Sequence, residues 1–360
     1  VTNTGSTREY TALWSPSGAE IAYITDSLEG QSLVITDQTG MGESRTFALG
    51  TYFYELTDWT DGDVERIVFE DNHATLYSIR LDNGDITRIS TDARRDDIQS
   101  SVSPDGQWLA FTAEQPNYHR DLVLYHFESG ERTTVTDGAA DVAAPAFSRD
   151  GAYLYFAAST NSGPLQVGLN MTSQERPYRA GLYAMVLAAD GKSPLLPESG
   201  DEEGADAADD EGDTDEDSNG EDQAEEPIQV DLDGIAERVV ALKVAERNYG
   251  NLEVADDGSL YYVQAVQAGA SNEPPGDRSA EGNALMRYDF EEKEAKSVLG
   301  GVTSFALSAD GKHIIVARAD GALATAELGA ELEAKPLDLG GVRVRVIPRE
   351  EWGMIFDESW

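Results

Sequence analysis

The side chains best able to do chemistry in this chain are four histidines and many carboxylates. The histidines stand at 73, 119, 126 and 313, without the spacing that would bring two of them to one metal ion. His126 and His313 fall inside strand-like runs, which favours a structural role, whereas His119 lies in a loop sequence and makes no site alone. No nucleophile elbow, zinc-protease motif or phosphate-binding loop is present. The sequence therefore predicts no catalytic residue, no cofactor and no metal ligand.

One acidic segment matches a metal-binding pattern. From Asp215 to Glu226 the residues fit the calcium-loop pattern D-x-[DN]-x-[DN]-G-x5-E. However, Asp222 stands where such loops carry an apolar residue, and no amphipathic helices flank the segment. Residues 198–226 hold 16 acidic and no basic side chains, so a match arises easily. We predict no metal site, and we expect the insert 198–227 to be disordered because it has little apolar surface to bury.

The element that must position any functional group is a hairpin that recurs along the chain. Its turns are rich in Ser, Pro and Asp, and they contain glycines at 18, 62, 106, 151, 258 and 311, each followed by a short β-rich run. Glycine supplies the positive φ of a tight turn. The first four glycines are 44, 44 and 45 residues apart, which is the length of one propeller blade. The sequence predicts an all-β fold, a β-propeller of four-stranded antiparallel blades over residues 1–341.

The number of blades depends on the gap between Gly151 and Gly258. Its 107 residues have room for two blades, or for one blade with a large insertion. The strand-like runs at 228–234 and 238–244 either form a degenerate blade of their own or complete the fourth one. Subtracting about 50 residues of insertions from the chain leaves about seven units of roughly 44 residues. We expect seven blades, with six as the alternative.

Composition restricts the partners. Lys and Arg total 26 against 68 Asp and Glu, a formal net charge of −42, which disfavours binding to nucleic acid or to an anionic membrane surface. There is no cysteine to form a disulfide, and no apolar run of 18 residues to span a membrane. The first residues look like the interior of a longer protein, so a targeting signal upstream would be invisible.

The last residues, 342–360, change character. They read as a linker strand followed by a helix that begins at Pro348, with two glutamates in its first turn. Four large apolar side chains lie on or near one face of this helix: Trp352, Ile355, Phe356 and Trp360. We expect this helix to begin a further domain that follows the propeller.

These features resemble the tricorn protease family. The Ser-Pro-Asp-Gly turns are shared with TolB-like propellers as well. More specific are the runs at 344–352 and 355–358 with Trp360, the segment at 231–242, and Gln-Pro-Asn-Tyr at 115–118. The resemblance covers essentially the whole chain, and it is to the second, seven-bladed propeller of such enzymes.

The resemblance implies that the serine nucleophile and its partners lie C-terminal to this chain, so none is carried by residues 1–360. It implies a cytoplasmic, homo-oligomeric serine endopeptidase or oligopeptidase with a PDZ-like module and a catalytic core. This chain would be the part that filters peptide substrates through its axis. A periplasmic location is the alternative compartment. The rival hypotheses are a TolB-like interaction propeller without an enzyme and the propeller of a prolyl-oligopeptidase-like hydrolase, and the gene beyond Trp360 would distinguish them.

Overall fold

The molecule is described here from a computed structural model. It describes residues 7–27, 30–60, 62–92, 98–161, 179–196, 227–266, 282–329, 331–342 and 347–359. The insert 198–227, apart from its last residue, lies outside this part of the chain, as do the calcium-loop match at 215–226 and most of the predicted linker strand.

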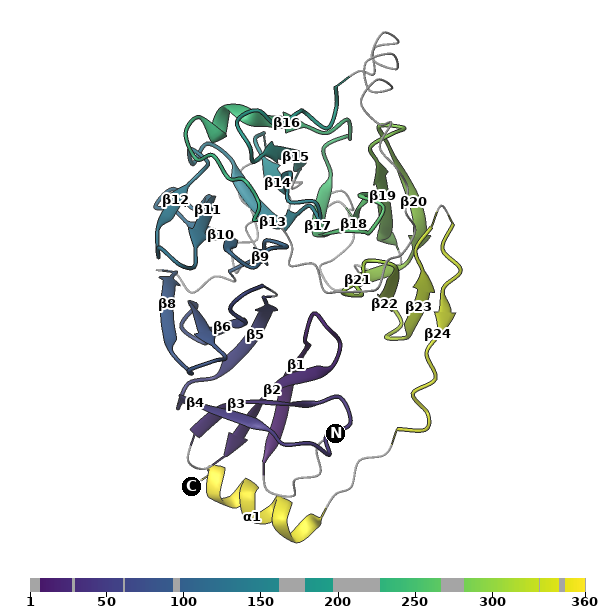
Figure 1. Cartoon of the computed structure of the whole chain (residues 1–360). Coiled ribbons are helices and arrows are strands. Elements are labelled where there is room, and N and C mark those ends of the chain that lie inside the picture. Colours follow the sequence, from purple (N-terminus) through teal and green to yellow (C-terminus); the bar gives the residue numbers. More distant parts are fainter. Residues whose placement is uncertain are drawn as a thin grey trace, which may run out of the picture.

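The described strands form six four-stranded antiparallel sheets, each built from four consecutive strands of the chain. We call these sheets blades 1 to 6 (Figure 1). Blades 1 to 3 contain β1 (Arg8–Trp14), β2 (Glu20–Ser27), β3 (Gly30–Asp37), β4 (Arg45–Gly50); β5 (Tyr54–Trp59), β6 (Arg66–Asp71), β7 (Thr75–Arg80), β8 (Ile86–Thr91); β9 (Ser100–Val102), β10 (Trp108–Glu114), β11 (Arg120–His126), β12 (Arg132–Thr134). Blades 4 to 6 contain β13 (Asp141–Phe147), β14 (Tyr153–Ser159), β15 (Gly181–Val186), β16 (Val239–Ala241); β17 (Asn248–Val254), β18 (Leu260–Ala265), β19 (Ala284–Asp289), β20 (Glu294–Gly300); β21 (Val302–Leu307), β22 (His313–Arg318), β23 (Leu323–Glu327), β24 (Lys335–Pro336).

The all-β propeller with four-stranded antiparallel blades is confirmed, but the prediction of seven blades is wrong. Six are present among the described residues, because β16 pairs with β15 across the acidic insert, with Val240 opposite Ala184. The runs on either side of the insert therefore complete blade 4 and do not form a blade of their own. The length estimate failed because it assigned too few residues to insertions.

The predicted turns join the first two strands of each blade, and their serines and aspartates have a structural role. In blade 3 the Ser103 hydroxyl donates to Asp105 Oδ1 (2.5 Å) and accepts from the Trp108 N–H (2.9 Å). Gly106 follows in the left-handed region, at φ 67°. Blades 4 and 6 repeat the same serine–aspartate bond in their own turns. The recurring Ser-x-Asp-Gly pattern is thus explained by hydrogen bonds that close the turn.

The core is divided among the interfaces between blades. Each of five apolar clusters joins two consecutive blades, from blades 1 and 2 to blades 5 and 6, and none of the five joins blade 6 to blade 1. Period-2 alternation accounts for this arrangement, because successive side chains of a strand point toward opposite neighbours. In β2, for example, Ala22 and Ile24 are fully buried against blade 2, whereas Ile21 and Tyr23 on the other face are only half-buried.

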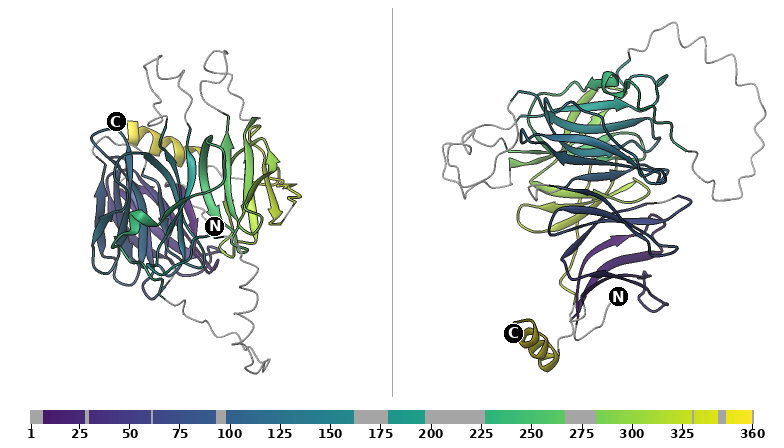
Figure 2. Two further views of the ribbon diagram at one scale, coloured as in Figure 1. Left: turned by 90° about the horizontal axis from the view of Figure 1, so that it is seen from above. Right: turned by 90° about the vertical axis from the view of Figure 1, so that its left-hand side faces the viewer.

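A short helical turn, η3 (Ile235–Arg238), precedes β16, and an α-helix, α1 (Pro348–Ser359), lies outside the six sheets (Figures 1 and 2). The side chains of Trp352 and Phe356 on α1 are 67% and 66% exposed. No helix in the described ranges is long and apolar enough to cross a membrane.

Candidate functional site at the hairpin-turn end of the ring

The four histidines do not come together. His73 lies between blade 2 strands, with its Nδ1 4.0 Å from Asp71 Oδ1, and His313 in blade 6 is exposed. His119 and His126 are both in blade 3, at opposite ends of β11; their Nδ1 atoms lie 3.0 Å from the Gly138 carbonyl oxygen and from the Ser129 hydroxyl, respectively. Within the described parts of the chain, no three His, Asp or Glu side chains are placed to hold a metal ion.

The innermost strand of each blade faces the common centre of the ring, so these strands are the natural place to look for a site (Figure 1). Side chains on them cross to the next blade and bond to its inner strand. Asp58 of β5 accepts a 2.6 Å hydrogen bond from the Ser100 hydroxyl of β9. Glu253 of β17 accepts one of 2.8 Å from the Leu307 N–H of β21. Polar contacts of this kind join the blades near the axis, beside apolar clusters that also include inner-strand residues such as Leu252 and Phe305.

These two carboxyl groups are perturbed by their surroundings. Burial raises the pKa of Asp58, and the Ser100 hydroxyl opposes that rise only in part. Burial also raises the pKa of Glu253 to about 7, against the lowering effects of the Leu307 N–H, the Asn251 amide and the charge of Arg149. A carboxyl group that titrates near neutral pH at a blade interface is a feature that sequence reasoning missed, because its burial depends on blade 6.

At one end of the ring the inner hairpin turns touch each other. The Asp256 N–H in the blade 5 turn donates to the Gly311 carbonyl oxygen in the blade 6 turn (3.0 Å). After the insert, the Ile228 N–H donates to Asp105 Oδ2 in the blade 3 turn (2.9 Å). We call this surface, formed by the described residues of the turns at 15–18, 60 and 62, 103–106, 148–151, 255–258 and 308–311, the turn end.

Arg149 of the blade 4 turn extends across the turn end. Its Nε donates to the carbonyl oxygen of Val254 in blade 5 (3.2 Å). Its Nη2 reaches blade 6 and donates to the carbonyl oxygens of Ser308 (3.3 Å) and Ala309 (2.8 Å). Gly311 makes room for this side chain, since a Cβ there would lie 2.5 Å from Arg149 Nε. One guanidinium therefore ties three blades together beside the axis.

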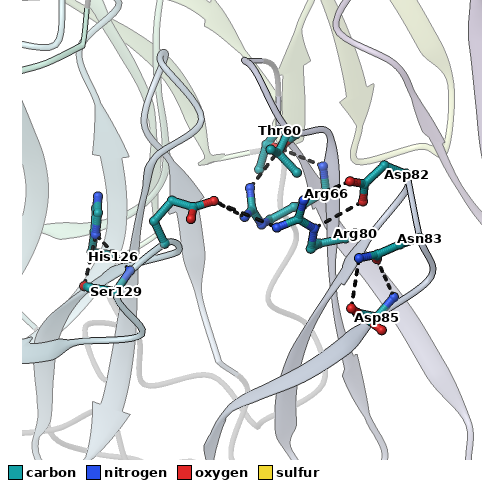
Figure 3. A network of polar contacts seen from close by, with 10 residues as sticks. Thr60, Arg66, Arg80, Asp82, Asn83, Asp85, His126 and Ser129 are labelled. Atoms are coloured by element: carbon teal, nitrogen blue, oxygen red, sulfur yellow. Dashed lines mark hydrogen bonds and ion pairs between the residues drawn. The ribbon is translucent and has the colours of Figure 1, made fainter.

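A second arginine joins blades 2 and 3 farther from the axis (Figure 3). The guanidinium of Arg66 pairs with Glu128 (Nη2 to Oε1, 3.1 Å) and lies over the ring of Phe127, 5.2 Å from its centre. Its backbone N–H donates to the Thr60 hydroxyl (2.8 Å). This contact holds an interface and offers no group to a ligand.

The Ser129 hydroxyl and His126 Nδ1 are a nucleophile and a base in contact (3.0 Å), but they lie in the exposed outer hairpin between β11 and β12 of blade 3. Comparison with known proteins agrees with the fold. Residues 1–328 match the family described as "Tricorn protease second beta propeller domain".

Two curated relatives and one solved structure cover nearly the whole chain. "Tricorn protease homolog 1" of Streptomyces coelicolor is 25% identical over 94% of this chain and 32% of its own length. "Tricorn protease" of Thermoplasma volcanium is 22% identical over 95% of this chain and 31% of its own. A crystal structure of the tricorn protease superposes with a TM-score of 0.72 at 18% identity, over 98% of this chain and 32% of that one. The chain thus spans about a third of the length of each.

Proposed function

Because the chain belongs to the family of the tricorn protease second β-propeller domain, we propose that it filters oligopeptide substrates for a serine-protease core C-terminal to it. The relatives are about three times as long as this chain, which leaves room in them for domains that it does not contain. The proposed partners are peptide substrates, and the catalytic core and PDZ-like module of the same polypeptide. We place the full protein in the cytoplasm, as a homo-oligomer.

The observation that carries the proposal is the way the inner strands and turns are tied together around the axis. The side-chain contacts Asp58–Ser100 and Glu253–Leu307 join neighbouring inner strands, and Arg149 joins three turns. These contacts fix the spacing of the inner strands of blades 2 and 3 and of the turns of blades 4 to 6, because each contact would have to break for them to separate. In this proposal the axis that they border admits an extended peptide and excludes a folded protein.

The test places an obstacle at the turn end. In the full-length protein, Ala309→Cys introduces a thiol on an exposed turn residue that already contacts Arg149, and this thiol is then modified with a bulky maleimide. The matched control is Asn83→Cys, on the exposed turn between β7 and β8, far out in blade 2. Residues 1–360 contain no cysteine that would compete for the reagent.

We expect the label at position 309 to slow hydrolysis of a long unfolded peptide several-fold, and to leave hydrolysis of a short chromogenic peptide nearly unchanged. The label at position 83 should affect neither. If the label at 309 leaves the long peptide unaffected, the axis is not the substrate path. If the unmodified full-length protein hydrolyses no peptide, the protease assignment itself fails.

A further inference from the structure

A cavity of about 640 Å³ opens between blades 4 and 5 at the turn end. It lies next to the axis, between the turn that carries Arg149 and the turn at 256–259. The interblade contacts described above do not fill it. Its walls combine two kinds of group, aromatic rings and carboxylates, whose joint presence points to a particular ligand.

The aromatic wall is continuous across the two blades. Tyr155 of β14 stacks on Phe290, which directly follows β19, with ring centres 5.3 Å apart and an angle of 30° between the planes. The ring of Tyr153 is 6.0 Å from that of Tyr155. Such rings give apolar contact to an aliphatic stem, and their faces attract a cation.

Among the side chains that line the cavity, carboxylates outnumber cationic groups. Arg287 is neutralised by two of them, with Nη2 3.0 Å from Asp257 Oδ2 and Nη1 3.1 Å from Asp289 Oδ2. Asp150 and Glu291 line the same cavity and form no ion pair with any described residue. Arg149 opposes them only in part, because its N–H groups bind carbonyl oxygens of the neighbouring turns. The cavity therefore has excess negative charge.

The hydroxyl of an almost fully buried tyrosine, Tyr155, supplies an independent sign of a ligand. Tyr155 is only 3% exposed and lines the cavity, yet its phenolic oxygen makes no hydrogen bond to any residue in the described ranges. Burial is the main cause that raises the pKa of this phenol, and the charge of Asp150 adds to it, so the hydroxyl stays protonated. The buried side-chain oxygens and nitrogens without a partner in the described ranges do not include this oxygen, so it opens to the cavity, where a polar ligand can bond to it.

We propose that this cavity binds the side chain of a lysine or arginine in a peptide at the turn end. The aliphatic stem lies against Tyr155 and Phe290, and the cation lies between Asp150 and Glu291. The inference rests on the proposed function, because it makes the cavity a holding site for basic residues of peptides on their way to the axis.

The test compares two small probes on the full-length protein: N-acetyl-lysine N-methylamide and N-acetyl-norleucine N-methylamide. They share the carbon stem and differ in the ammonium group. Binding is measured by ligand-observed NMR titration at low and at high salt. We expect the lysine probe to bind at least about five-fold more tightly, with an advantage that shrinks at high salt.

Variants then locate the site. Asp150→Asn keeps an oxygen to accept from the Ser148 hydroxyl and removes the charge. Asp150→Asn and Glu291→Gln should each weaken binding of the lysine probe about two- to five-fold, which corresponds to the free energy of an exposed ion pair. Neither variant should change binding of the norleucine probe. Tyr155→Phe removes the hydroxyl and keeps the ring stacking, and it should also weaken binding of the lysine probe. The control is Asp85→Asn, which removes one charge from the outer turn of blade 2 and should change neither probe.

Equal affinity for the two probes, or lysine binding that Asp150→Asn and Glu291→Gln leave intact, would overturn the proposal. The result is independent of the maleimide test. An effect of the label at position 309 without lysine selectivity would refute the cavity site alone, and lysine selectivity without that effect would refute the filter alone.

Discussion

The guanidinium of Arg149 donates a 2.8 Å hydrogen bond from Nη2 to the carbonyl oxygen of Ala309, although blade 5 lies between the blades that carry them. Propeller blades normally contact only their neighbours, so this link spans two interfaces at once. It makes the positions of the turns in blades 4, 5 and 6 depend on one side chain.

Replacing this side chain should loosen that half of the ring. We expect Arg149→Gln to lower the free energy of unfolding by on the order of 1 kcal/mol, since hydrogen bonds to three carbonyl oxygens are exchanged for hydrogen bonds to water. Urea unfolding measures the change. Lys296→Gln serves as the control, because Lys296 pairs with Glu292 in its own hairpin and both groups are exposed. An effect of Arg149→Gln no larger than that of the control would show that the link across blades does not stabilise the ring.

Two turn glycines separate the cost of backbone strain from the cost of a close contact. Gly258 (φ 77°) has no atom within 4 Å of a Cβ built on it, whereas a Cβ on Gly311 (φ 64°) would lie 2.7 Å from the Asp256 backbone nitrogen. Gly258→Ala should therefore show only the left-handed penalty, about 1–2 kcal/mol, and Gly311→Ala a larger loss. Thermal unfolding of the two variants side by side is the measurement, and equal midpoints would contradict the close contact.

The stability of the protein should carry a pH-dependent contribution from Glu253. Burial raises the pKa of this carboxyl group from 4.5 in the unfolded chain to about 7 in the folded one. Between these two pH values the folded state binds more protons than the unfolded chain. The contribution of Glu253 to the free energy of unfolding therefore falls as pH rises through this window, and it is constant below and above it. The full change is on the order of 3 kcal/mol, because one pKa unit corresponds to about 1.4 kcal/mol.

Glu253→Gln removes this titration and keeps an oxygen for the Leu307 N–H. Relative to the parent protein, the variant should be more stable at pH 8 than at pH 5, as followed by urea unfolding at both values. Parallel pH profiles of the two proteins would show that Glu253 does not titrate in this range.

Residues 1–360, produced alone, should fold and hydrolyse no peptide, because the contact between the Ser129 hydroxyl and His126 Nδ1 (3.0 Å) lies in an exposed outer hairpin of blade 3 and not in a substrate cleft. Circular dichroism checks the fold, and release of fluorophore from quenched peptides checks the activity, with the full-length protein assayed in parallel. Hydrolysis by a purified fragment would place a catalytic group in this chain and require another function.

Much of the fold could be predicted because its signals are local. The serines, aspartates and glycines of each turn bond within a few residues, as Ser103 does with Asp105 and Trp108, so their spacing along the chain indicates where hairpins form. The short β-rich runs that follow the turns then predict strands, and the period predicts propeller blades.

The sequence by itself therefore determined the kind of fold, the four-stranded blade and the turn chemistry, while only the tertiary structure decided how many blades exist and which groups meet. The pairing of Val240 with Ala184 across the acidic insert cannot be recognised from the spacing of residues along the chain, and it is the reason why the propeller has six blades and not seven. Likewise, Arg149 is an ordinary turn residue in the sequence, and Tyr155 an ordinary strand residue. Their roles arise from residues more than 100 positions away, brought near by the closure of blades 4 to 6, and contacts at such separation depend on the whole chain's packing.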